Sequence, residues 1–133
     1  MAIRFNHLNI IASPDSGVQQ MLVNVLGLEI GSRPNFPFNG QWLYQGDKAL
    51  VHIIENEIGE CQFGHLAFEL DMSLQDLTNK LQQQEIKYNV RQVPDSNNVQ
   101  VFVRAGEMVF ELIASDKPTQ QKFTHFTQHE ELL

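Results

Sequence analysis

Phe5-Asn6-His7-Leu8 and Phe63-Gly64-His65-Leu66 decide the fold, because the second stretch repeats the first 58 residues later (63 − 5). A second match lies near the end of each half. Leu50-Val51-His52-Ile53-Ile54 aligns with Val109-Phe110-Glu111-Leu112-Ile113 at a separation of 59 residues (109 − 50). Matches that stay in register over most of a chain indicate an internal repeat. The sequence therefore predicts two copies of one supersecondary unit.

Each copy is expected to contain a strand, a helix and three further strands. Runs rich in β-branched and aromatic residues predict the strands, and apolar residues at helical spacing predict the helices. Asp15 and Ser73 are expected to open the helices, and Gly27 to end the first one. The expected strands are 3–12, 28–32, 41–45, 48–55, 62–71, 86–93, 99–104 and 107–114, and the expected helices are Asp15–Leu26 and Met72–Gln84.

These elements predict an α+β fold made of two βαβββ modules. The modules are expected at about 3–55 and 62–114, and a polar C-terminal tail occupies 115–133. Neither half alone carries enough apolar surface for a comfortable domain. We therefore expect residues 1–133 to form a single domain in which the two modules share one core.

Composition excludes several classes of protein. The chain has 133 residues, of which 42% are hydrophobic and 19% charged, as in ordinary globular domains. Its formal charge of −7 and the lack of a basic stripe argue against nucleic acid as a partner. No stretch of about 18 apolar residues predicts a membrane helix, and Met1–Phe5 lacks the layout of a signal peptide. With Cys61 as the single cysteine, we expect a cytoplasmic protein without a membrane partner.

Strand alternation separates the candidate ligands from the core. Because successive side chains point to opposite faces, His7 and His65 lie opposite the apolar residues that should pack under the helices. His52 and Glu111 occupy equivalent positions in the last strand of each half. A carboxylate in so apolar a strand is costly to bury without a partner, and a cation would offset that cost. The alternative for each histidine is a hydrogen-bonded core residue. That alternative requires all four residues to share repeat-equivalent positions and strand faces by coincidence.

This pattern resembles the vicinal-oxygen-chelate superfamily, which includes glyoxalase I, extradiol dioxygenases, methylmalonyl-CoA epimerase and the fosfomycin- and bleomycin-resistance proteins. The similarity extends from about residue 3 to residue 114. It implies a cupped, half-open mixed sheet around a central site, with the helices outside, and a homodimer that binds a small molecule. It also implies metal ligands at His7, His52, His65 and Glu111. Aromatic residues usual before the segment Val25-Leu26-Gly27-Leu28 are missing here.

Three imidazoles and one carboxylate suit Fe, Ni, Mn, Co or Zn as a divalent ion. The resemblance implies an ion with open positions for two neighbouring substrate oxygens. We favour lyase or isomerase chemistry, in which Glu111 doubles as the proton carrier. An Fe(II)-dependent extradiol-type dioxygenase, with ligands His7, His65 and Glu111, is one alternative, and His52 would be an awkward fourth ligand there. A non-catalytic small-molecule-binding protein of the resistance type is another.

Substrate contacts are expected from the aromatic segment before the strand that leads to His52. Phe38, Trp42 and Tyr44 form the predicted pocket wall, although these rings could equally close the open side of the sheet. Arg104 is the candidate for holding an anionic substrate group, although a solvated arginine at the end of a strand is the preferred interpretation. His125 and His129, four residues apart in the tail, have a spacing that grips metals on helices, but a solvated terminal helix is the better interpretation.

Overall fold

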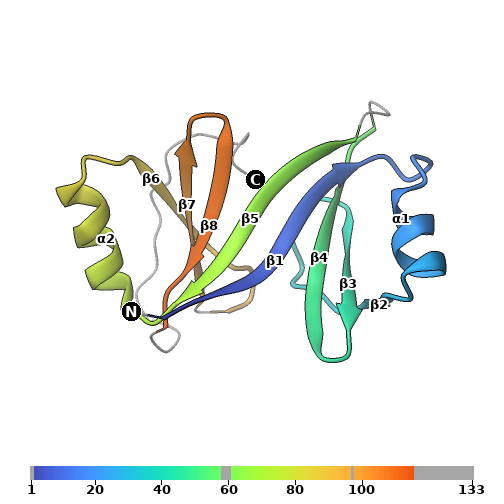
Figure 1. Cartoon of the computed structure of the whole chain (residues 1–133), viewed down its shortest axis with the longest axis horizontal. Coiled ribbons are helices and arrows are strands. Elements are labelled where there is room, and N and C mark those ends of the chain that lie inside the picture. Colours follow the sequence, from blue (N-terminus) through green and yellow to red (C-terminus); the bar gives the residue numbers. More distant parts are fainter. Residues whose placement is uncertain (1, 58–60, 97, 116–133) are drawn as a thin grey trace. The chain divides into compact units, whose positions relative to one another are not determined.

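The computed structural model describes residues 2–57, 61–96 and 98–115. It contains the predicted strand, helix and three strands, followed by the same order again (Figure 1). Most of the predicted tail, with His125 and His129, lies outside the described residues. Cys61 is exposed, and none of the helices in the described ranges is long and apolar enough to cross a membrane.

The observed bounds match the predicted ones within a few residues. The first half comprises β1 (Ile3–Ala12), α1 (Val18–Gln20), η1 (Met21–Val25), β2 (Glu29–Gly31), β3 (Gly40–Gln45) and β4 (Lys48–Glu55). The second comprises β5 (Gln62–Leu70), α2 (Leu74–Gln83), β6 (Tyr88–Gln92), β7 (Val99–Ala105) and β8 (Met108–Ile113). The hairpins β3–β4 and β7–β8 turn at Gly46 and Gly106, whose φ angles of 61° and 63° are left-handed and suit glycine.

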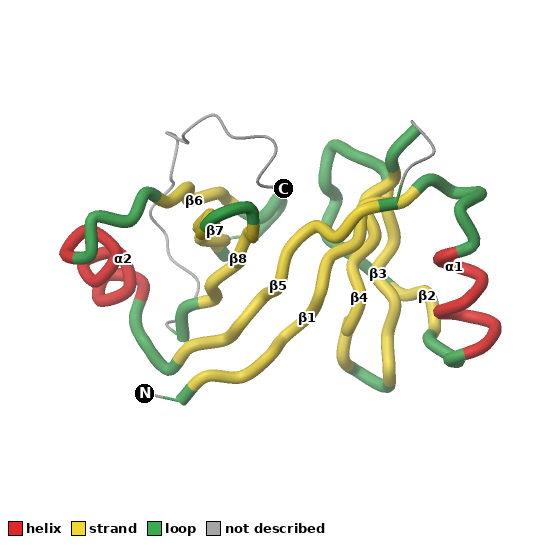
Figure 2. The backbone as a smooth tube through the Cα atoms, turned by 45° about the horizontal axis from the view of Figure 1, so that its top comes forward, coloured by secondary structure: helices red, strands yellow, loops and turns green. Residues whose placement is uncertain are grey.

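The strands are hydrogen-bonded in the order β2-β3-β4-β1-β5-β8-β7-β6 (Figure 2). The pairings β1–β4 and β5–β8 are parallel, and the three-strand meanders β2-β3-β4 and β6-β7-β8 are antiparallel. The predicted α+β fold with an open mixed sheet is therefore confirmed.

Contacts divide the chain into two compact units. Unit 1 comprises Met1–Asn6 and His65–Leu133, and unit 2 comprises His7–Gly64. The boundary crosses β1 and β5 in the middle of each strand, so both units contain part of both strands. A backbone hydrogen bond of 3.0 Å from Asp71 to Ala2 joins the ends of these strands within unit 1.

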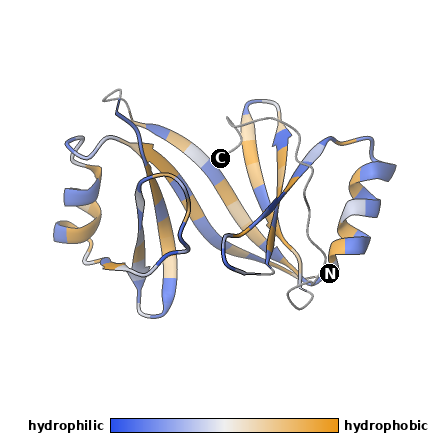
Figure 3. Ribbon diagram, turned by 180° about the vertical axis from the view of Figure 1, so that it is seen from behind, coloured by the Kyte–Doolittle hydropathy of each residue, from blue (hydrophilic) through white to orange (hydrophobic). Residues whose placement is uncertain are grey.

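The core of unit 2 lies between its strands and the helical segment α1–η1. Buried Ala12, Leu43, Val51 and Ile53 form its centre, and Leu8, Ile10, Val18, Leu22 and Val23 are among the residues that pack against it. The predicted alternation in β1 is confirmed, because Leu8 and Ile10 face this core. Figure 3 shows the same alternation as hydrophobic and hydrophilic bands along the strands.

The first helix differs from the prediction at its start and in its pitch. It begins at Val18 rather than at Asp15, because Gly17 adopts a left-handed φ of 87° that a helix cannot contain. Its second part is a π-turn, in which the amide of Leu26 bonds to the carbonyl of Met21 at 3.1 Å. The wider turn changes which side of the helix faces the core. Val23 therefore packs inward, while Met21, Val25 and Leu26 are exposed.

Unit 1 builds its core under α2. Ser73 caps this helix by accepting a 3.0 Å hydrogen bond from the amide of Asp76. Leu74, Leu77 and Leu81 recur at helical spacing and pack against the strands. The core is completed by strand residues that include Phe68, Leu70, Val90, Val101, Val103 and Leu112. The polar residues that alternate with them must therefore occupy the other face of the strands.

A close approach within unit 2 explains the glycine of the second repeated stretch. An added Cβ on Gly64 would lie 1.8 Å from the side-chain oxygen of Asn9. Asn9 is buried, and its amide nitrogen donates to the carbonyl of His52 at 3.0 Å. Asn9 cannot move away without losing this bond, so only glycine fits opposite it.

We predict that Gly64→Ala destabilises the protein. Alanine in a strand interior is ordinarily favoured over glycine by roughly 0.5–1 kcal/mol, but the clash with Asn9 reverses the sign, and overpacking costs about 1–3 kcal/mol. Urea unfolding followed by circular dichroism measures the change. Gln62→Ala, at an exposed position of the same strand, is the matched control. A Gly64→Ala protein as stable as the parent would contradict this packing.

Candidate functional site

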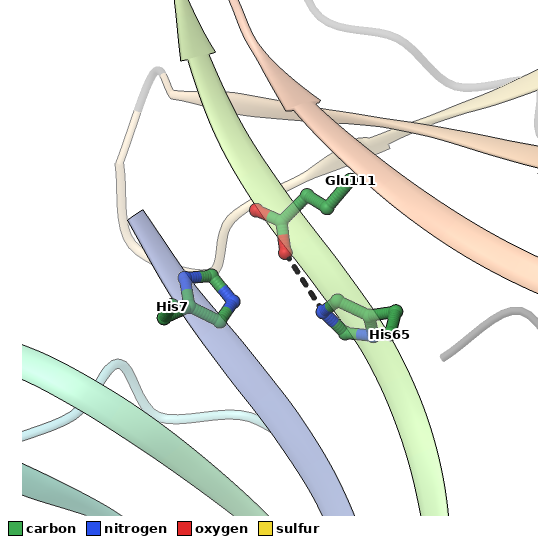
Figure 4. Close-up of side chains that lie close together, drawn as sticks. All are labelled: His7, His65 and Glu111. Atoms are coloured by element: carbon green, nitrogen blue, oxygen red, sulfur yellow. Dashed lines mark hydrogen bonds and ion pairs between the residues drawn. The ribbon is translucent and has the colours of Figure 1, made fainter. Parts of the chain in front are cut away.

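His65 and Glu111 form a buried pair within unit 1. They come from the parallel neighbours β5 and β8, on the face opposite the helix. Nε2 of His65 lies 3.0 Å from Oε1 of Glu111, as the dashed line in Figure 4 marks. Only 5% of His65 and 4% of Glu111 is exposed. Because an ionised carboxylate only accepts hydrogen bonds, Nε2 is the donor in this contact.

Other residues of unit 1 hold this pair in place. The ring of Phe102 meets the His65 ring edge-on, with centroids 5.3 Å apart. The side chain of Gln100 donates to Oε2 of Glu111 at 3.5 Å. Phe102 and Val109 form a small buried cluster on the same face. The carboxylate thus lies in apolar surroundings, where its interaction with a positive charge is stronger than in water.

His7 and His52 lie in unit 2, on the adjacent parallel strands β1 and β4. Their rings stack with centroids 3.6 Å apart and planes 18° from parallel. His52 in turn stacks on Trp42, its neighbour across β3–β4, at 3.8 Å. Nε2 of His52 also lies 3.1 Å from the carbonyl oxygen of Ala49. Rings on both faces and this backbone contact therefore constrain His52.

The predicted pocket wall contains a second aromatic group in unit 2. Phe36 stacks on Phe38 at 5.0 Å and approaches Trp42 at 6.4 Å. Arg33 lies over both phenylalanine rings, 5.7 and 5.4 Å from their centroids, and donates to the carbonyl of Phe38. This cation–π contact uses a residue that the sequence patterns did not single out.

Tyr44 and Arg104 have other surroundings. The Tyr44 hydroxyl donates to the carbonyl of Ser32, and its ring covers Gly31, where an added Cβ would lie 2.5 Å from ring carbons. Tyr44 therefore fastens the edge strand β2 to β3. Arg104 is exposed near the end of β7. The proposed substrate contacts of Phe38, Trp42, Tyr44 and Arg104 remain predictions.

Two polar residues on β6 were not identified from the sequence. Asn89 is 1% exposed, and Arg91 is half-buried two positions further along the strand. Val90, between them, belongs to the core under α2, so both side chains turn to the face that carries Glu111. The period-two pattern of Tyr88–Gln92 contains this signal, because polar Asn89 and Arg91 alternate with apolar Val90.

Comparison with known proteins identifies the fold. No family model and no curated protein matches the sequence. Among solved structures, methylmalonyl-CoA epimerase from Mycobacterium tuberculosis matches with a TM-score of 0.64 at 14% identity, over 85% of this chain and 88% of that one. The 2,3-dioxygenase LapB from Pseudomonas sp. KL28 matches with a TM-score of 0.67 at 18% identity, over 84% of this chain and 40% of that one.

Homoprotocatechuate 2,3-dioxygenase from Brevibacterium fuscum, in complex with 3,4-dihydroxyphenylacetate, matches with a TM-score of 0.65 at 12% identity. The match covers 84% of this chain and 36% of that one. The chain thus spans well under half of both dioxygenases but most of the epimerase. At these identities the likeness is one of fold. The repeated βαβββ topology gives this chain the same fold as the epimerase and dioxygenase structures, which is the fold that the resemblance in its sequence implied.

Proposed function

We propose that this protein is a metal-dependent enzyme in which His7, His65 and Glu111 bind one divalent ion, with Fe, Ni, Mn, Co and Zn as candidates. Its substrate is a small molecule that chelates the ion through neighbouring oxygens. The observation that carries the proposal is the buried pair of His65 and Glu111. The shared fold with an epimerase and with dioxygenases supports it.

The electrostatics of the pair support a cation. Moving a carboxylate out of water costs several kcal/mol even after relaxation. A neutral imidazole offsets this cost with one hydrogen bond, whereas a divalent ion offsets it with two positive charges. Imidazole and carboxylate together are a donor set that first-row divalent metals accept.

His7 supplies the third donor in this proposal. It is the repeat equivalent of His65, and it follows Asn6, whose side chain donates to Glu69 of β5 within unit 1. Each of His7, His65 and Glu111 is buried and carries a side chain that can offer one ligand atom to the proposed ion. Two imidazoles and one carboxylate leave positions for a substrate and for water.

The ion, when bound, polarises the substrate oxygens and stabilises negative charge that develops on them. The protein groups then orient the reactants. Gln100 restrains Glu111, Phe102 restrains the His65 ring, and the stacked His52 ring restrains His7. Glu111 is also the group that carries a proton to or from substrate carbon if the chemistry is that of a lyase or isomerase.

The role of His52 decides between reaction classes. Four protein ligands favour a lyase or isomerase, because a fourth protein ligand takes a position that oxygen chemistry needs. The contact of His52 with Ala49 and its position between two rings favour a supporting role instead. We therefore propose three ligands. This ligand set also fits the two-histidine, one-carboxylate site of Fe(II) oxygenases, so an extradiol-type dioxygenase is the second candidate. Homodimerisation and a cytoplasmic location remain predictions.

Metal content tests the site. Protein purified without chelator is expected to hold about one ion per chain by mass spectrometry. His7→Ala, His65→Ala and Glu111→Gln should each weaken metal affinity roughly 100-fold or more, since even an outer-shell change costs 10- to 100-fold. Glu107→Ala removes an exposed carboxylate next to β8 and serves as the control. Full metal content in both His65→Ala and Glu111→Gln would disprove the assignment.

A paired substitution tests His52. His52→Phe keeps a flat ring between His7 and Trp42, so we expect it to retain about one ion per chain. His52→Ala removes the ring and should weaken metal binding about 10-fold through loss of His7 orientation. Titration with Zn²⁺ followed by calorimetry measures both. If His52→Phe loses the ion as completely as His65→Ala, His52 is a fourth ligand and the lyase or isomerase class is favoured.

The reaction class can be separated with the loaded protein. A three-ligand Fe(II) site predicts oxygen uptake with catechol-type diols, recorded with an oxygen electrode. Lyase or isomerase chemistry predicts metal-dependent exchange of a proton next to a carbonyl, recorded by NMR in heavy water. Glu111→Gln should abolish either activity. Binding of such molecules without any turnover would favour the resistance-type alternative.

A further inference from the structure

The β6 residues Asn89 and Arg91 carry a second feature of unit 1, separate from the proposed metal ligands. Asn89 is 1% exposed, yet neither its amide nitrogen nor its amide oxygen has a hydrogen-bond partner among the described residues. Nε of Arg91 is buried and equally without a partner in that part of the chain. Buried polar groups are nearly always hydrogen-bonded, so such exceptions need a reason.

Strand register places both residues on the face of Glu111. Asn89 pairs with Phe102 across β6–β7, and Phe102 pairs with Glu111 across β7–β8. Arg91 pairs with Gln100, whose side chain reaches Glu111. The side chains of Asn89 and Arg91 thus lie two strands away from the Glu111 carboxylate, beside Phe102 and Gln100.

We infer that Asn89 and Arg91 bind a carboxylate group of the substrate, whose other end holds the neighbouring oxygens that chelate the metal. This inference rests on the proposed function and adds the chemical class of the substrate. Nε of Arg91 and Nδ2 of Asn89 are donors, and a carboxylate accepts such pairs with charge-assisted bonds. The guanidinium charge excludes a cationic group there and favours an anionic group over a neutral one.

The charges on this face are compatible with an anion. Glu111 is separated from Asn89 by the Phe102 position, and its charge is the one that the proposed ion neutralises. Glu69, on β5, is paired with Arg4 and accepts a bond from Asn6. Arg91 makes no ion pair with any described carboxylate. Within the described ranges, its positive charge is therefore available to a ligand.

Arg104, which the sequence predicted as the contact for an anionic group, is the alternative to Arg91. It lies on the same face of β7 but is exposed, and an exposed arginine gains less from a carboxylate than a half-buried one. Comparing variants of the two arginines distinguishes binding at Arg91 from a general attraction to positive charge on this face of the sheet.

The experiment uses Zn²⁺-loaded protein and two chelating probes that differ in one group. 3,4-Dihydroxyphenylacetate carries a carboxylate, and 3,4-dihydroxyphenylethanol is its neutral analogue. We expect the parent protein to bind the carboxylate probe 10- to 100-fold more tightly, the range for a hydrogen bond to a charged group. Calorimetry gives both dissociation constants.

Arg91→Gln should reduce this selectivity to about twofold or less without changing the affinity for the neutral probe or the metal content. Arg104→Gln should retain the selectivity, and Lys87→Gln, an exposed charge loss beside β6, is the matched control. Equal affinity of the parent protein for the two probes overturns the inference. So does a loss of selectivity in Arg104→Gln but not in Arg91→Gln.

Asn89→Leu adds a readout that a structural asparagine would not produce. Leucine has a similar size and no polar atoms, so it should raise the thermal unfolding midpoint while it lowers affinity for the carboxylate probe about 10-fold. A lower midpoint together with unchanged affinity contradicts the inference. If the protein binds no metal, the proposed function is contradicted and this inference is not. The side-chain amide resonance of Asn89 then still reports, by NMR, whether carboxylate binds.

Discussion

A carboxylate buried in a β-sheet is the constraint on which the site depends. Glu111 is 4% exposed in a strand that is otherwise apolar. An isolated charge there would be prohibitively costly, so neighbouring residues must compensate. His65 and Gln100 donate hydrogen bonds to it, and Phe102 fixes the ring of His65. The strand alternation that sends Leu112 into the core leaves Glu111 no other face to occupy.

In unit 2, aromatic stacking restrains the candidate ligand. The ring of His7 is held by His52, and His52 is held by Trp42 and by the carbonyl of Ala49. His52 lies between two rings and cannot tilt, so it offers the His7 ring a fixed surface to stack on. Rigid support of this kind is what a metal ligand needs, because misplacement by a fraction of an ångström weakens coordination.

Local patterns predicted the fold well, and their failures have physical causes. β1 and β4 have the predicted bounds because alternation and turn residues mark them clearly. The first helix starts late because the left-handed Gly17 lies inside the predicted range, and its face is rotated by a π-turn that no spacing rule anticipates. For the site, the repeat singled out His7, His52, His65 and Glu111. The stack around His52 depends on contacts across strands, and so does the lack of a partner for the Asn89 amide within the described ranges; one sequence does not display either.

The division of the chain into units has a consequence for how the protein is made. Met1–Asn6 belong to the same unit as the second half of the sequence, and the amide of Asp71 bonds to the carbonyl of Ala2. During synthesis, the first part of β1 therefore emerges long before its partner strand exists. Contacts between residues so far apart slow folding and leave a strand edge exposed meanwhile. Because the two repeats share strands in this way, unit 1 cannot fold until both halves of the chain have been synthesised.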